Sequence, residues 1–182
     1  MNKEQNPLSD GNNEEPDPEK FFDEENYSTL LVGDKEFKSP KKAILEDLVE
    51  LLTSDDHVKK DAALALLKNE KAKNFLLDAI HHIDNDEHQS VLVAACWECG
   101  LDFSDQLETF VELVIEGDYF TAIEAITVIE NMESAIEEPV LDKAIKSLQE
   151  AIEKKDDKMI LMSDIKINLL ERKARFRPKA ED

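Results

Sequence analysis

The chain has 182 residues, of which 41% are hydrophobic and 6% aromatic, and its 43 acidic residues outnumber 22 basic ones to give a net charge of −21. This length and apolar content suit one domain with one hydrophobic core. So negative a surface repels nucleic-acid phosphates and anionic lipid headgroups, whereas it attracts basic proteins. We therefore expect neither a nucleic acid nor a membrane as a partner, and no stretch approaches the apolar length of a membrane span.

The two cysteines and the amino-terminal sequence indicate in which cellular compartment the protein is found. Cys96 and Cys99 lie three residues apart in an apolar helical stretch, where a disulfide would not join distant parts of a fold. The first residues lack the apolar segment of a secretory signal peptide. Both features are typical of a protein in a reducing compartment, so we expect a cytoplasmic location.

Residues 1–38 are predicted to form a flexible acidic tail. Up to Tyr27 the sequence is rich in Asn, Glu, Asp and Pro and poor in aliphatic side chains, a composition that does not offset the entropy lost on ordering. Within it, Phe21–Phe22 is a candidate docking segment, either for a groove on another protein or for the first repeat of this chain. The stretch from Tyr27 to Val32 is a candidate for a short extended piece.

From Ser39 to Arg172 the chain repeats one pattern four times: an apolar helix, an acidic turn and a second apolar helix, at intervals of roughly 31 to 39 residues. The four turns lie at residues 54–56, 84–87, 117–118 and 156–157. A single helix pair of this kind leaves apolar surface exposed, but stacked pairs bury it. The predicted fold is therefore all-α, an α-solenoid of about four stacked antiparallel helix pairs over residues 39–172, followed by a basic tail at residues 173–182.

The first pair is predicted to open at Ser39–Pro40, because Ser is a good N-cap and Pro suits the first helical position. Its first helix should face the core with the apolar residues between Ile44 and Leu52. The side of its second helix that is expected to face the core comprises Val58, Ala62, Ala65 and Leu66.

The later pairs have clearer boundaries. The second pair is expected at residues 71–83 and 86–99, and Gly100 is a natural helix end. In the third pair, Gly117 ends one helix and Asp118 caps the next at once, so the two helices must be antiparallel and in contact. The predicted core positions of the last two second helices include Tyr119, Ala122, Ile126, Ile160, Ile165 and Leu170.

The turn and second helix of the first two pairs share a motif. Residues 55–67 read DDHVKKDAALALL, and residues 91–100 repeat the theme of small apolar residues closed by Gly. In these features the chain resembles the HEAT-like repeat family, over about residues 40–172. It departs from the family pattern at Ser90 and Thr121, where the basic residue that would pair with a turn Asp is missing. The resemblance implies a solenoid whose second helices line its inner face.

Potential metal ligands gather around the second turn. They are His81, His82, Asp84, Asp86, Glu87 and His88, with Cys96 and Cys99 one helix later. A zinc site is not favoured, because adjacent histidines on a helix point about a hundred degrees apart. A calcium site is not favoured either, because the turn lacks the required Gly and closing Glu. No strand is predicted to lead into a Gly-x-Ser-x-Gly nucleophile elbow, and the four Gly of the chain form no Gly-rich phosphate-binding loop. We expect no metal, no cofactor and no catalytic residue.

The resemblance places any recognition surface on the second helices. The candidate binding residues are His88, Trp97, Glu98, Thr121, Glu124, Thr127 and Asn131. Trp97 is the only Trp of the chain, and its amphipathic ring would anchor a partner if it reached the surface, or else belong to the core.

These features favour a non-catalytic interaction module or adaptor, which uses an acidic solenoid face to bind a basic or amphipathic segment of another protein. Two alternatives stay open. One is an enzyme, since some HEAT-like solenoids act as DNA glycosylases or bilin lyases; the other is an inhibitor whose acidic surface mimics nucleic acid. The basic residues 172–179 either interact with the dipole of the last helix, pair with the acidic tail or contact nucleic acid.

Overall fold

The computed structural model describes residues 27–32, 35–40, 42–68, 70–83, 85–154 and 157–176. Side chains are described from residue 45 to residue 175 within these ranges, apart from residues 70 and 71. The candidate docking segment Phe21–Phe22 lies outside the described residues, as do residues 1–26 and 177–182.

The described chain begins with a two-stranded antiparallel hairpin. Strand β1 (Tyr27–Val32) pairs with β2 (Lys35–Pro40), and β2 also packs on the second helix pair. The extended piece expected at residues 27–32 is present, but its pairing with the next segment was not predicted. The expectation that Ser39–Pro40 opens a helix is wrong, since both residues end a strand; Pro lacks an N–H and is tolerated on an edge strand.

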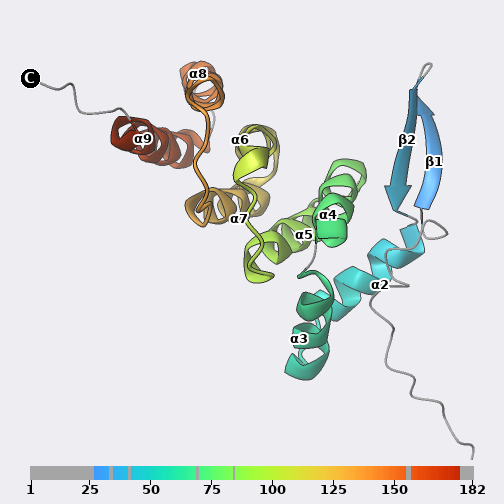
Figure 1. The fold of residues 1–182 in the computed structure, drawn as a ribbon. Helices are drawn as coiled ribbons and strands as arrows, with labels where there is room; N and C mark the ends of the chain where they lie inside the picture. Colours follow the sequence, from blue (N-terminus) through green and yellow to red (C-terminus); the bar gives the residue numbers. More distant parts are fainter. Residues whose placement is uncertain are drawn as a thin grey trace, which may run out of the picture.

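Eight α-helices follow within the described residues (Figure 1). In chain order they are α2 (Lys42–Leu52), α3 (His57–Leu66), α4 (Glu70–His82), α5 (Asp86–Glu98), α6 (Leu107–Glu116), α7 (Tyr119–Glu130), α8 (Glu138–Glu153) and α9 (Met159–Phe176). A short 3₁₀ helix, η2 (Ser104–Gln106), leads into α6. The helices lie where the sequence predicts four pairs, and they confirm the helical class of this region. None of them combines the length and apolarity needed to span a bilayer.

Consecutive helices pack together in pairs: α2 with α3, α4 with α5, α6 with α7, and α8 with α9. Neighbouring pairs are joined mainly by α5 against α7 and by α6 against α8, while α2 also contacts α5. Figure 1 shows the pairs following one another along the molecule in chain order. We call α2, α4, α6 and α8 the first helices, and α3, α5, α7 and α9 the second helices.

One hydrophobic cluster runs through all four pairs, from Leu45 in α2 to Leu169 in α9. Its largest fully buried side chains include Phe75, Phe103 and Phe110. The rings of Phe103 and Phe110 meet edge to face with centroids 5.5 Å apart, an arrangement that aromatic pairs favour. The single core expected from the length and composition is therefore confirmed for the described residues.

Three second helices start in the same way, with the side chain of a turn residue accepting a hydrogen bond from the first helical turn. Asp56 accepts from the backbone N–H of Val58 at 3.0 Å, Asn85 from that of His88 at 2.9 Å, and Asp118 from that of Thr121 at 2.7 Å. Such N-caps satisfy N–H groups that have no partner within the helix. The polar turns of the repeat thus set where α3, α5 and α7 begin.

The buried side of α3 differs from the prediction. Val58, Ala62 and Ala65 are exposed, Val58 at 77% of its surface, whereas Ala63 and Leu67 are buried. Apolar residues occupy every position from 62 to 67, so the sequence pattern surrounds the helix and does not select one side. Packing against α2 selects the side instead.

Three other residues expected in the core are also exposed. Tyr119 lies at the start of α7, and Ile160 and Leu170 lie on α9. As in α3, the apolar residues of α9 extend around most of the helix, and only those that face α7 and α8, such as Ile165 and Leu169, are buried. The sequence identified both helices but not their buried sides.

Candidate protein-binding site on the second helices

Two side-chain contacts connect the solvent-exposed sides of three second helices. The indole Nε1–H of Trp97 on α5 donates to Oε2 of Glu124 on α7 at 2.8 Å. One residue after Trp97, Glu98 accepts a hydrogen bond from Nζ of Lys60 on α3 at 2.9 Å. The exposed sides of α3, α5 and α7 are thus adjacent, and we call them the second-helix face.

The candidate residues Trp97, Glu98 and Glu124 therefore meet on one surface. Trp97 is 37% exposed, so its ring reaches solvent while its indole N–H is already satisfied. An exposed ring that is held by a hydrogen bond loses little freedom when a partner covers it. These three residues form the centre of the candidate site.

Thr127 and Asn131 lie further along α7, but their polar groups form hydrogen bonds with the backbone of the same helix. The hydroxyl of Thr127 donates to the carbonyl of Ile123 at 3.0 Å, and Nδ2 of Asn131 donates to the carbonyl of Thr127 at 2.8 Å. His88 lies near the opposite end of α5 from Trp97, about 13 Å along the helix axis. These three residues border the site rather than forming its centre.

Thr121 does not lie on the surface, so its assignment to the recognition surface is wrong. It is fully buried beside Ala122 and Ala125, and no protein group within the described residues forms a hydrogen bond with its hydroxyl. Thr121 lies three residues after the cap Asp118, in the first turn of α7, on the side that packs inward. A Cβ added at Gly117 would lie 2.8 Å from its methyl group, so Thr121 also packs against the turn before α7.

The exposed hydrophobic side chains are the strongest feature of the surface, and their distribution was not predicted from the sequence. Among the described side chains, every large hydrophobic residue that is exposed belongs to a second helix. These residues are Val58, Trp97, Tyr119, Phe120, Met159, Ile160, Ile167 and Leu170. Phe120, 68% exposed, precedes Glu124 by four residues and so extends the same side of α7. The sequence held no clear signal for this exposure, because adjacent apolar residues elsewhere, such as Leu92 and Val93, are both buried, whereas Tyr119 and Phe120 are both exposed.

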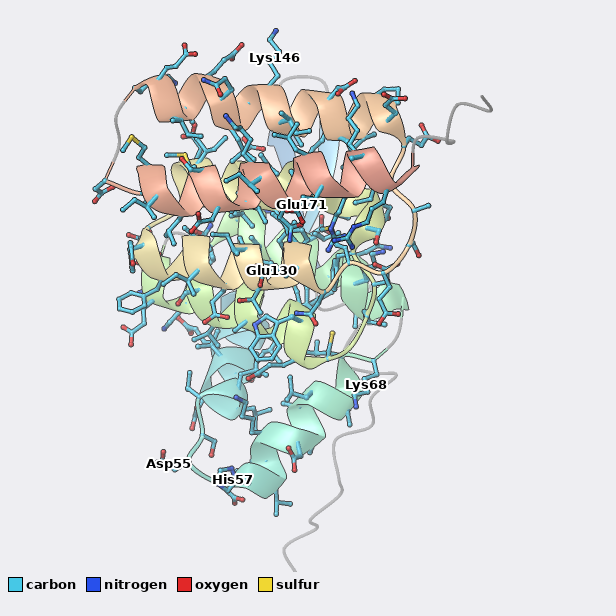
Figure 2. The ribbon with its side chains drawn as sticks, turned by 90° about the vertical axis from the view of Figure 1, so that its left-hand side faces the viewer. Asp55, His57, Lys68, Glu130, Lys146 and Glu171 are labelled. Atoms are coloured by element: carbon cyan, nitrogen blue, oxygen red, sulfur yellow. The ribbon has the colours of Figure 1, made fainter. Side chains whose placement is uncertain are left out.

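The second-helix face is negatively charged where α5 and α7 meet. Both helices contain acidic residues, and neither contains Lys or Arg. The exposed or half-exposed acidic side chains of these two helices are Asp86, Glu87, Glu98, Glu124 and Glu130, of which Glu130 lies on the side towards α9, beside Glu171 and Arg175. Figure 2 shows Glu130 on α7 and Glu171 on the neighbouring α9. Such a surface attracts cationic groups and repels phosphates.

Several basic residues of this acidic chain hold the helices in place. Nζ of Lys73 donates to the backbone carbonyl of Asp102 at 2.8 Å and lies 5.2 Å from the ring centre of Phe103. Nζ of Lys158 donates to the carbonyl of Ile115 at the end of α6 at 2.8 Å. The guanidinium of Arg172 donates to three carbonyls at the end of α7 at 2.9 to 3.0 Å. Arg172 therefore interacts with the C-terminus of α7, not with that of its own helix.

Asp102 joins the connection between α5 and α6 to the connection between α7 and α8. Its carboxylate accepts hydrogen bonds from Ser104 and from the backbone N–H groups of Glu133 and Ser134 at 3.3 and 3.2 Å. Burial alone would raise the pKa of Asp102, but these hydrogen bonds outweigh it and lower the pKa to about 2. The ionised carboxylate thus holds the two connections together.

The histidine-rich turn and the cysteines offer no assembled site in the described residues. No group of three or more His, Cys, Asp or Glu is arranged there to hold a metal ion, and Asp84 lies outside the described residues. Cys96 and Cys99 are buried, and burial raises the pKa of the Cys96 thiol well above its usual value. A buried neutral thiol is a poor nucleophile, so the structure gives both cysteines a packing role.

The comparisons with known proteins give no relative: no family model, no curated protein and no solved structure matches the chain.

Proposed function

We propose that the protein is a non-catalytic binding module, a HEAT-like α-solenoid whose second helices bind a basic or amphipathic segment of another protein. The observation that carries the proposal is the distribution of exposed hydrophobic side chains, all of which lie on second helices among the described residues. Exposed apolar side chains rimmed by charge are typical of interaction sites.

The packing of the helices supports the solenoid arrangement. Each pair contacts the next in chain order, and α5, α7 and α9 stack in sequence, as do α6 and α8. In such an array the second helices form a continuous surface that reaches across several repeats. Only a partner that spans neighbouring repeats would contact Val58, Trp97 and Phe120 together.

The energetics favour an amphipathic partner over a purely ionic one. Covering the exposed ring of Phe120 contributes on the order of 1.5 kcal/mol, and an interfacial Trp such as Trp97 frequently contributes more. The acidic groups around them are exposed to water, so each adds little affinity; together they speed the approach of a basic segment. The partner therefore needs apolar anchors flanked by Lys or Arg.

The test is affinity capture from native lysate by the purified chain, at low and at moderate salt, with identification of bound proteins by mass spectrometry. We expect one or two stoichiometric proteins, whose binding weakens with salt and is lost in a Phe120→Ser variant. Glu124→Gln should reduce capture at low salt, whereas Glu112→Gln, which makes the same charge change at an exposed position of α6, should not. Equal capture by all these variants contradicts the proposal.

The same experiment separates the competing functions. An enzyme on this scaffold would retain a small molecule or nucleic acid rather than a protein. An inhibitor that mimics nucleic acid would capture nucleic-acid-binding proteins, and it would do so independently of Phe120, because mimicry depends on charge rather than on apolar anchors.

A further inference from the structure

The last helix carries an exposed apolar stripe that the second-helix face does not include. Met159, Ile160, Ile167 and Leu170 of α9 are 40%, 69%, 53% and 45% exposed. Ser163 and Ala174 continue the same side of the helix with small side chains. The spacing of residues 159, 163, 167, 170 and 174 is the spacing by which one helix packs along another. We call these residues, with Ile160, the α9 stripe.

The α9 stripe lies on the side of α9 that faces away from α7. Arg172 marks the opposite side, because its guanidinium donates to the carbonyls of Ile129 and Met132 at the end of α7. The stripe is roughly half a turn around the helix from Arg172. α8 and α9 lie at one end of the array in Figure 1, and Figure 2 views the molecule from that end. None of the described helices or strands covers the stripe.

The exposed surface of α8 beside the stripe is polar. Asp142 and Lys146 are exposed there, and Asp142 contacts Lys173 of α9. The uncovered apolar surface is therefore one helix wide. A further helix pair would need apolar residues on both α8 and α9, whereas a single helix needs only the α9 stripe. The geometry thus selects one helix as the occupant.

The charged residues that border the α9 stripe determine which charge a bound helix should carry. Towards α8, Lys166 donates to Gln149, and Lys173 is bound to Asp142 and, at 3.1 Å, to Glu138, so both lysines are engaged within the fold. On the other border, Asp164 and Glu171 are exposed.

The acidic border is only weakly compensated. Among the described side chains, Glu171 forms an exposed ion pair with Arg175 at 3.6 Å, which contributes little. A complementary helix carries Lys or Arg along this border. A second copy of the chain would bring another acidic border, and another net charge of −21, to the same place.

We propose that the α9 stripe binds one amphipathic α-helix of a partner protein, whose apolar side is flanked by Lys or Arg. This inference rests on the proposed function, since it adds a second contact surface for the same class of partner. The bound helix takes the position of the next second helix of the array. Covering the stripe leaves no polar group unsatisfied at its centre, because the hydroxyl of Ser163 already donates to the carbonyl of Met159 at 2.7 Å.

The test uses the full chain and a defined probe. The probe is a fluorescent synthetic peptide of about 21 residues, with Leu at the two seam positions of each heptad and Lys and Ala elsewhere; its control has the same composition in an order that spreads Leu around the helix. We expect the patterned peptide to bind at least about tenfold more tightly than the control peptide. The double variant Ile167→Ser with Leu170→Ser should weaken this binding at least about tenfold, without a change in charge. Because the second-helix face is proposed to bind the same class of segment, the double variant is also made in the Phe120→Ser chain, where the loss is measured against Phe120→Ser alone and should again be at least about tenfold.

Each other outcome contradicts the inference in a distinct way. Equal affinity for both peptides means that charge alone is recognised. Loss of binding in Phe120→Ser but not in the double variant places the peptide on the second-helix face, which overturns this inference and supports the proposed function. If the peptide binds at the stripe while the Phe120 and Glu124 variants capture proteins from lysate normally, this inference is supported and the proposed function is overturned. Concentration-dependent dimers in sedimentation, abolished by the double variant, identify a second copy as the occupant and also overturn the proposal.

Discussion

The first and second helices of this protein bury apolar surface to different extents. In α6 and α8, Phe110 and Leu148 are fully buried, and none of the described large hydrophobic side chains of these two helices is exposed. In α5 and α7 the seam is made partly of small residues, including Ala95, Ala122 and Ala125, while Trp97 and Phe120 reach solvent.

Small residues in a seam let two helix backbones approach closely, and α5 and α7 form the most extensive contact between neighbouring pairs. The second helices thus contain more apolar surface than their packing buries. The apolar side chains that remain exposed to solvent are the basis of the proposed binding role, and they are not needed for folding.

Removing one Phe from a first helix and one from a second helix should have very different effects on stability. Phe110→Ala in α6 should lower the free energy of unfolding by about 3 to 5 kcal/mol, because it leaves a cavity in the core. Phe120→Ala in α7 should change it by less than about 0.5 kcal/mol. Urea denaturation of both variants measures the difference, and similar losses for the two would show that Phe120 is part of the packing.

A charge introduced on the buried side of a second helix should destabilise the protein more than a charge on its exposed side. Ala125→Asp should destabilise by about 3 kcal/mol or more, since the new carboxylate enters the buried seam without a partner. Ala94→Asp, on the half-exposed side of α5, should cost less than about 1 kcal/mol, mainly through helix propensity. Thermal melts of the two variants should differ by well over the error of the measurement; overlapping melts would place Ala94 in the seam as well.

The connections that fix the positions of the two helix sets depend on the ionised form of Asp102. Because its pKa is about 2, below the ordinary value, the stabilisation is complete above about pH 4 and is lost as the pH falls through 2. Solvent screens part of this effect, so we expect roughly 1 kcal/mol. The loss of stability between pH 5 and pH 2 should be smaller by that amount in Asp102→Asn. An identical pH dependence in both proteins argues against the hydrogen-bonded carboxylate.

The smallest effect concerns the contact between Trp97 and Glu124. Glu124→Gln keeps the shape and removes the charge-assisted hydrogen bond, so stability should fall by less than about 1 kcal/mol. The emission of Trp97, the only Trp of the chain, should nevertheless shift, because its indole N–H loses a charged acceptor. Glu112→Gln on α6 is the matched control and should leave the spectrum unchanged.

The repeat pattern was sufficient to predict the helices, because acidic turns and apolar periodicity are local signals. Asp118 and Gly117 illustrate this, since a cap and a helix end can be recognised within one turn of sequence. The hairpin at residues 27–40 was missed because its second strand has a charged, turn-like composition that only pairing with the first strand makes regular.

The buried sides of the second helices could not be read from the sequence. In α3 and α9 the apolar residues extend around the helix, so that Val58 and Ile160 look the same as core residues. Which side is buried depends on the neighbouring pair, a contact between segments far apart in the chain. Trp97 and Glu124 were identified as candidates by their place on second helices, but the hydrogen bond between them required the packing of α5 on α7.

The most direct test of the central claim is covalent surface footprinting of the chain, alone and in the complex isolated by capture. If the second helices bind the partner, labelling of Trp97, Tyr119 and Phe120 should fall several-fold in the complex, while labelling of the exposed side chains of α6 and α8 stays unchanged. Protection of α6 and α8 with full labelling of Trp97 and Phe120 would contradict the account.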